Sequence, residues 1–184
     1  MKKPVKFENI HKDLIEACLN GNRRAQYEIY KLYYRAMFNS CVRIVNNVSE
    51  AEDIMQEAFL KTFFKLSEYK GDVSFGAWLK KIVINQSIDF IRSRKIIYEP
   101  LENKMNEIAE ETENEETISG IEPELIFKEI ENLPESYRII LSLYLIEDYN
   151  HKEIAEMLNI SSSTSRSQYA RAKKKLINNL KKKS

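Results

Sequence analysis

Apolar residues recur every three or four positions along most of the chain, which places them on one face of an α-helix. Runs that alternate apolar and polar residues, as strands do, are few. Only four Gly and four Pro interrupt the pattern in 184 residues. The sequence therefore predicts an all-α protein.

The N-terminal half of the chain predicts four helices. They cover about residues 12–19, 24–45, 49–66 and 75–97, with turn-forming Asn and Gly residues between them. The inward face of the second helix is predicted to be Tyr27, Tyr30, Tyr34, Met37, Phe38, Cys41 and Val45. Ser49, with Glu52 three residues later, predicts a capping box for the third helix. Ser74 is expected to cap the fourth.

The C-terminal half begins with a change of composition. Residues 99–122 are rich in Glu, Asn and Thr and contain few apolar residues, so they predict a flexible acidic linker. Four short helices follow, over about residues 124–132, 134–146, 152–158 and 163–180, with Pro134 at the first position of its helix. The predicted organisation is two small helical domains, 10–97 and 124–184, joined by a linker over 98–123.

Charge is segregated along the chain although the formal net charge is only +1. Residues 1–98 contain 17 basic and 11 acidic side chains, residues 99–135 contain 2 and 13, and residues 136–184 contain 10 and 4. Basic segments attract polyanions and release counterions on binding them. Each basic block is therefore a candidate nucleic-acid surface. The alternative is that these charges are solvated helix faces.

The positions of the two cysteines and the absence of catalytic motifs argue against a metal site and against enzyme activity. Cys18 and Cys41 lie among helix-spaced apolar residues and predict reduced core cysteines, and no CxxC or Cys/His cluster suggests a metal site. No catalytic motif such as a P-loop, HExxH or nucleophile elbow is present. We therefore expect no enzyme activity, no cofactor and no small-molecule substrate. The apolar runs are too short to cross a bilayer, which predicts no membrane insertion and a cytoplasmic location.

Residues 151–166 form a helix-turn-helix pattern: an amphipathic helix, a tight turn and a helix with Ser and Thr at its start. Tyr169, Ala172, Leu176 and Leu180 give the second helix an inward stripe. Its other face holds the candidate DNA contacts, which are Ser163, Arg166, Ser167, Gln168, Arg171 and Lys174. Helix pairs joined by a turn also occur in α-helical proteins that do not bind DNA.

The third predicted helix has an unusual second face, opposite its core stripe. It consists of Asp53, Gln56, Glu57, Leu60, Lys61 and Phe64. Large apolar side chains among carboxylates and an amide favour a protein-binding face over an ordinary solvated one.

Residues 69–94 interleave aromatic, amide and basic side chains after a glycine-containing loop, a mixture that suits a single nucleic-acid strand. The candidate contacts are Phe75, Trp78, Lys80, Lys81, Asn85 and Arg92. The alternative places Phe75, Trp78 and Phe90 in the core and pairs Asp89 with Arg92. The amide of Asn85 has the donors and the acceptor needed to read the edge of an extruded base.

The order of these segments resembles the extracytoplasmic-function group of the sigma-70 family over nearly the whole chain. Residues 51–61 are similar to the segment that grips the clamp helices of the largest polymerase subunit. Residues 69–94 are similar to the segment that melts and recognises the minus-ten element, with Asn85 at the base-reading position. Residues 133–138 and the helix-turn-helix are similar to region 4, which binds the minus-thirty-five duplex.

This resemblance implies an alternative sigma factor and its partners. These are core RNA polymerase, through the clamp helices and the flap, promoter DNA, and an anti-sigma factor. Two positions depart from the family pattern: Ser165 stands where an apolar residue is usual, and Gln168 where Arg is common. A helix-turn-helix regulator that binds duplex DNA unaided and a purely protein-binding helical adaptor are the alternative functions.

Overall fold

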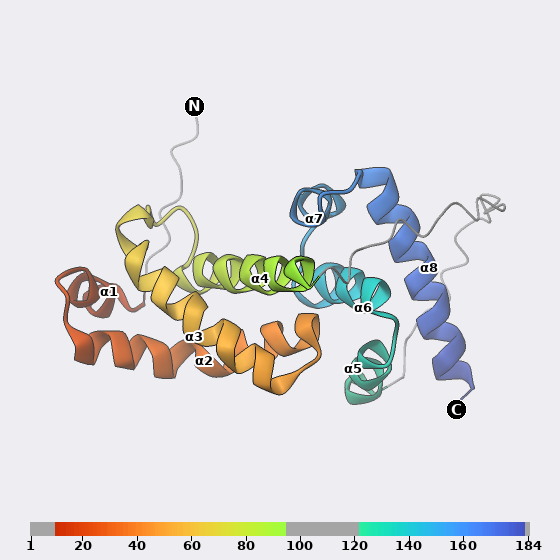
Figure 1. Ribbon diagram of the computed structural model, residues 1–184, viewed down its shortest axis with the longest axis horizontal. Coiled ribbons are helices and arrows are strands. Elements are labelled where there is room, and N and C mark those ends of the chain that lie inside the picture. Colours follow the sequence, from red (N-terminus) through yellow and green to blue (C-terminus); the bar gives the residue numbers. More distant parts are fainter. Residues whose placement is uncertain (1–9, 95–121, 183–184) are drawn as a thin grey trace. The chain divides into compact units, whose positions relative to one another are not determined.

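The computed structural model describes residues 10–94 and 122–182, and within these ranges every regular element is helical (Figure 1). The all-α prediction is thus confirmed. The described residues fall into two compact units, one containing α1 to α4 and the other α5 to α8. The predicted linker over 98–123 lies almost wholly outside the described residues, so its boundaries stay a prediction.

The first unit is built around the long helix α2. It contains α1 (Lys12–Leu19), α2 (Arg23–Val45), α3 (Val48–Phe64), a 3-10 turn (Leu66–Glu68) and α4 (Phe75–Ser93). Helix α2 packs against both α1 and α3. The shared core includes Ile29 and Cys41 from α2, Met55 from α3, and Leu79 and Val83 from α4. Burial of these apolar side chains is the main force that holds the unit together.

The N-terminal cap of α3 differs from the prediction. Helix α2 ends at Val45, its C-cap Asn46 adopts a left-handed φ of 57°, and α3 begins at Val48. The side chain of Asn47 accepts the backbone N–H of Glu50 at 3.2 Å, so Asn47 is the cap and the predicted Ser49 capping box is wrong. The reason is that α3 starts one residue after Asn47, which places Ser49 inside its first turn. The predicted cap of α4 is confirmed, since Ser74 Oγ accepts the Ala77 N–H at 3.2 Å.

The inward face of α2 also needs correction. Tyr27 was expected in the core but is 59% exposed, and the Lys31 ammonium lies 4.9 Å from the centre of its ring. Ile29 and Ile44 are fully buried instead. A tyrosine side chain is compatible with solvent because its ring carries a polar hydroxyl, whereas an isoleucine side chain stabilises the protein only when it is buried. The spacing of apolar residues alone does not tell which of these side chains is buried.

The second unit contains four helices and a π-helical segment. The elements are α5 (Pro123–Glu131), α6 (Glu135–Leu141), the π-helical η2 (Ser142–Ile146), α7 (His151–Leu158) and α8 (Ser162–Lys181). Pro134 is the N-cap of α6 rather than its first residue. Helix α8 packs against α5, α6 and α7, and it buries Ala172, Leu176 and Leu180 as predicted.

Helices α7 and α8 form the predicted helix-turn-helix. Asn150 and Glu153 make a reciprocal capping box at the start of α7. Asn159, with φ 54°, ends that helix in the left-handed conformation. Ser161 Oγ then accepts the Thr164 N–H at 3.0 Å and caps α8. In the turn, the Asn159 backbone N–H donates to carbonyls at the end of α7 and the Ser161 hydroxyl accepts from the start of α8, so groups that helix ends leave unpaired are satisfied on both sides.

Both cysteines are buried free thiols, as predicted, and burial raises the pKa of each. Across residues 10–94 and 122–182 we find no cluster of three or more His, Cys, Asp or Glu suited to a metal ion. No helix among these residues is both long enough and apolar enough to cross a membrane.

Candidate functional site

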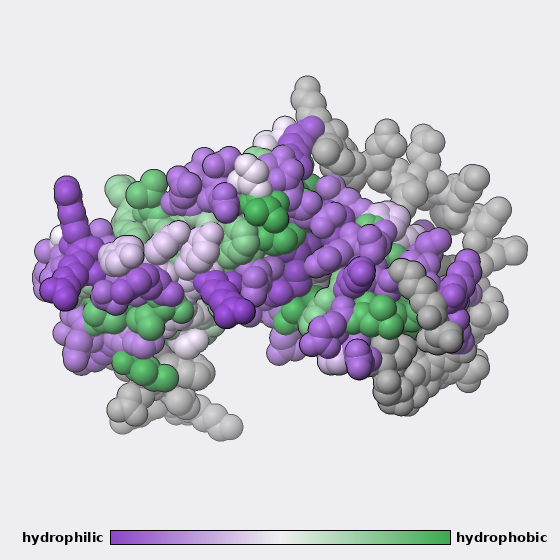
Figure 2. All heavy atoms as spheres, turned by 90° about the horizontal axis from the view of Figure 1, so that it is seen from below, coloured by the Kyte–Doolittle hydropathy of each residue, from purple (hydrophilic) through white to green (hydrophobic). Residues whose placement is uncertain are grey.

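Helix α3 presents two large apolar side chains to solvent. Leu60 is 71% exposed and Phe64 is 89% exposed, although the opposite side of the same helix is completely buried. The predicted polar neighbours on this face, Asp53, Gln56, Glu57 and Lys61, are exposed as well. In the space-filling view, apolar residues reach the surface between hydrophilic ones in this unit (Figure 2). We call these six residues of α3 the α3 face.

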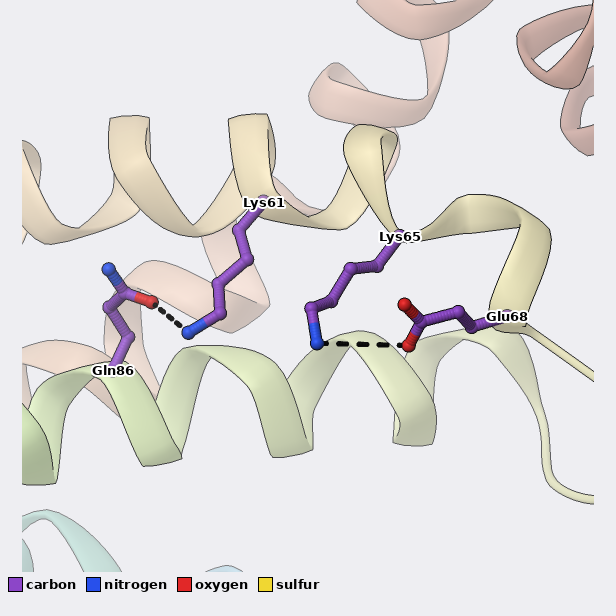
Figure 3. A network of polar contacts seen from close by, with 4 residues as sticks. All are labelled: Lys61, Lys65, Glu68 and Gln86. Atoms are coloured by element: carbon purple, nitrogen blue, oxygen red, sulfur yellow. Dashed lines mark hydrogen bonds and ion pairs between the residues drawn. The ribbon is translucent and has the colours of Figure 1, made fainter.

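Gln86 links the α3 face to α4, a contact that the sequence did not predict. Its Nε2 donates to Glu57 Oε2 at 3.0 Å, and its Oε1 accepts from Lys61 Nζ at 3.1 Å. Figure 3 shows the second bond spanning the two helices. An amide that donates to a carboxylate and accepts from an ammonium holds two opposite charges in place at once. Nothing in the spacing of a single sequence indicates such a pairing.

Helix α4 carries four of the predicted strand-binding residues on one face. Trp78, Lys81, Asn85 and Arg92 are separated by three, four and seven residues, so they lie along one side of the helix. Lys81 and Arg92 are exposed, and Trp78 and Asn85 are half-buried. We call these four residues the α4 face. Lys80 is half-buried and points to a different side.

Phe75 does not belong to the α4 face. It is only 1% exposed, and its ring lies 5.3 Å from Tyr33, 5.5 Å from Tyr69 and 5.7 Å from Trp78, centre to centre. A buried ring surrounded by aromatic neighbours cannot contact a DNA strand, so we correct the prediction that it does. The alternative interpretation as a core residue is confirmed for Phe75, while Trp78 and Phe90 are only partly buried against the same core. The Phe75 ring packs against that of Trp78, which belongs to the α4 face.

Helix α8 exposes its predicted contact residues. Ser163, Arg166, Ser167, Arg171 and Lys174 all face solvent, and the inward stripe lies on the other side. Gln168 is half-buried, and its Oε1 is inaccessible to solvent. The first turn of α8 contains no acidic residue. Its unpaired backbone N–H groups and the basic side chains that follow therefore create a positive end.

Two family models match the two units of this chain. The family model described as Sigma-70 region 2 matches residues 29–96, which contain the α3 and α4 faces, and the one described as Sigma-70, region 4 matches residues 124–176. The RNA polymerase sigma-H factor of Pseudomonas aeruginosa is 30% identical over 173 residues, covering 87% of this chain and 88% of that protein. This chain belongs to the extracytoplasmic-function sigma factors of the sigma-70 family.

A further relative carries the name of that group. The ECF RNA polymerase sigma factor SigW of Bacillus subtilis is 29% identical over 180 residues, which cover 92% of this chain and 96% of SigW. The sigma factor therefore spans nearly the full length of the relatives that it matches. Like them, it is an RNA polymerase sigma factor for promoter-specific transcription initiation.

Two solved structures share the fold. One is the sigma factor RpoE in complex with the anti-sigma factor NepR from Bartonella quintana, with a TM-score of 0.54, 19% identity, and coverage of 84% of this chain and 96% of that one. The other is CnrH in complex with the cytosolic domain of CnrY, with a TM-score of 0.53, 20% identity, and coverage of 94% and 98%. At these identities the similarity supports the fold alone.

Proposed function

We propose that this sigma factor binds core RNA polymerase through the α3 face, opens and reads the minus-ten DNA through the α4 face, and binds the minus-thirty-five duplex through α8. The observation that carries the proposal is the half-buried Asn85, which lies on the same side of α4 as the exposed Lys81 and Arg92, on a helix that the buried Phe75 anchors among aromatic rings. An ordinary duplex-binding regulator has no need for such a base-reading amide outside its helix-turn-helix.

The α3 face has the composition of a protein-binding surface. Leu60 and Phe64 offer apolar area that water solvates poorly, and the charged groups around them can select a partner of complementary charge. The Gln86 bridge fixes Glu57 and Lys61 before any partner arrives. Preorganised side chains lose less conformational entropy on binding. In this family the matching partner is the clamp-helix region of the polymerase.

The α4 face has the groups needed to hold a separated strand. Lys81 and Arg92 are exposed cations that can bind the phosphates of a DNA strand. Trp78 is half-buried and offers part of its ring for a base to stack on. Asn85 lies between Lys81 and Arg92 along the helix, where its amide can pair with the edge of a base that has left the duplex. Melting then follows from differential binding, because these contacts exist only with the open strand.

Helix α8 provides the duplex contact. Arg166 and Arg171 can each donate two hydrogen bonds to the edge of a guanine in the major groove. The lysines farther along the helix bind phosphates whatever the base sequence. Both solved structures described above are two-protein complexes, and one partner is named an anti-sigma factor. By this likeness we include an anti-sigma factor among the partners of the present chain.

The experiment that tests the proposal replaces Asn85 with Ala. Alanine keeps the helix but removes the amide donors and acceptor. We expect a loss of about 1–3 kcal/mol, roughly a tenfold to hundredfold loss of open complex. The readouts are permanganate footprinting of the minus-ten region by reconstituted holoenzyme and run-off transcription from the same template. Core binding should be unchanged, because Asn85 is not part of the α3 face.

Gln86→Ala is the matched control. It removes an amide from the neighbouring position, but one that points to α3 rather than outward. At saturating core polymerase this variant should open the promoter as wild type does. If Asn85→Ala opens and transcribes as well as wild type, Asn85 is a structural residue and the base-reading role is wrong.

A further inference from the structure

Ser165 is a buried hydroxyl in the middle of a DNA-binding element. It belongs to the first turns of α8, has no solvent exposure, and immediately precedes Arg166. Its Oγ lies 2.9 Å from Nδ1 of His151, the first residue of α7. A buried polar group is costly unless it is hydrogen-bonded, so this bond determines whether the site is stable. It also joins the two helices of the helix-turn-helix at the end nearest the predicted base contacts.

The imidazole of His151 is held by two tyrosines. Its ring is stacked on Tyr144 at 4.5 Å with an interplanar angle of 19°, and it meets Tyr169 edge-on at 5.4 Å. Tyr144 and Tyr169 are themselves 4.4 Å apart. The three rings come from three successive elements, η2, α7 and α8. The rings leave His151 little freedom to turn away from Ser165.

The charge state of His151 suits this bond. Burial lowers the pKa of the imidazole, and the nearby Arg166 guanidinium lowers it further. The neutral ring is therefore the dominant form at pH 7. A neutral imidazole pairs with a hydroxyl in either direction, because each group can both donate and accept.

We propose that His151 is a positioning residue for promoter recognition: through its bond to Ser165 it sets the rotation of the first turns of α8 and so the direction of Arg166. This inference rests on the proposed reading of the minus-thirty-five duplex by α8. Ala172, Leu176 and Leu180 anchor the later turns of the helix but none of its first turns. Tyr169 holds the second turn of α8 through its ring contacts with Tyr144 and His151, and the His151–Ser165 bond adds a constraint one turn earlier, beside Arg166. A purely structural polar pair would contribute to folding but not to the choice of bases.

A matched pair of substitutions separates these roles. His151→Asn keeps a polar atom at the position of Nδ1, whereas His151→Gln moves it to the position of Nε2, and both lose the ring. The preferred minus-thirty-five sequence is first selected from a randomised duplex library with wild-type holoenzyme. The measured quantity is the ratio of holoenzyme affinity for this sequence to its affinity for a scrambled one, well below the unfolding temperature.

We expect His151→Gln and Ser165→Ala each to lower this ratio by about two- to tenfold, the range that one hydrogen bond supports, and His151→Asn to retain more of it. Combining His151→Gln with Ser165→Ala should give no further loss, because both remove the same bond. An unchanged ratio in Ser165→Ala, or equal losses in His151→Asn and His151→Gln, overturns the proposal.

Arg166→Ala distinguishes this failure from that of the proposed function. If Arg166→Ala loses base preference and Ser165→Ala keeps it, α8 reads the duplex and only the positioning role is wrong. If Arg166→Ala keeps the wild-type preference, α8 does not read the duplex through this residue, and both proposals fall together.

Discussion

Replacing Phe64 with Ala tests the α3 face most directly. Phe64 is the last residue of α3 and 89% of its surface is open to solvent, so nearly all of its apolar area is available to a partner. Burying a phenylalanine side chain is worth about 1.5–3 kcal/mol. If the polymerase covers this ring, we expect Phe64→Ala to weaken core binding by roughly tenfold to hundredfold. The assay is a titration of labelled sigma factor with core polymerase, followed by fluorescence anisotropy.

Two controls make the result specific. Leu32→Ala removes a half-exposed apolar side chain from α2, outside the α3 face, and should leave the affinity for core polymerase unchanged. Phe59→Ala, in the same helix as Phe64 but buried, should lower the free energy of unfolding by about 3–5 kcal/mol. Phe64→Ala itself should change that free energy by less than about 0.5 kcal/mol, because the residue is on the surface. Wild-type affinity in Phe64→Ala would refute the assignment.

Three further predictions concern the caps, the duplex contact and pH. Asn47→Ala should lower the free energy of unfolding by about 1 kcal/mol and Ser49→Ala by much less, as chemical denaturation would show; equal effects would contradict the assigned cap. Arg166→Ala should cost about 1–3 kcal/mol and relax base preference, whereas Lys181→Ala should weaken all sequences alike and flatten the salt dependence, both measured by gel shift with holoenzyme. Because the pKa of His151 is lowered on folding, its contribution to stability is complete above the unfolded pKa near 6.5 and is lost as the pH falls through the folded pKa. Thermal melts of His151→Asn should lack this acid-side loss, and an unchanged pH profile would count against it.

The order of helices and the family could be predicted from the sequence because both depend on local patterns. Three-to-four spacing of apolar residues is a property of neighbouring positions, and it placed the helices to within a few residues. The capped, basic second helix of the helix-turn-helix was recognisable for the same reason. The exposed character of Leu60 and Phe64 also followed from spacing, since they lie opposite a continuous core stripe.

Only the tertiary structure decided which of several suitable residues took each role. Asn47 and Ser49 are both good caps, and the choice depended on where α2 ended. Tyr27 and Ile29 both fit an apolar stripe, and the packing of α2 against its neighbours buried the isoleucine. Phe75 has an aromatic side chain that could stack on a base, yet rings from three segments enclose it.

The contacts between distant residues were beyond the reach of any local pattern. Gln86 meets Glu57 across 29 positions, and His151 meets Ser165 across a turn and two helix ends. A hydrogen bond of this kind depends on the distance and angle between two side chains, which are defined only after the helices have packed. The sequence alone thus determined which helices form and which faces they offer. The packed structure determined which polar side chains hold those faces in place.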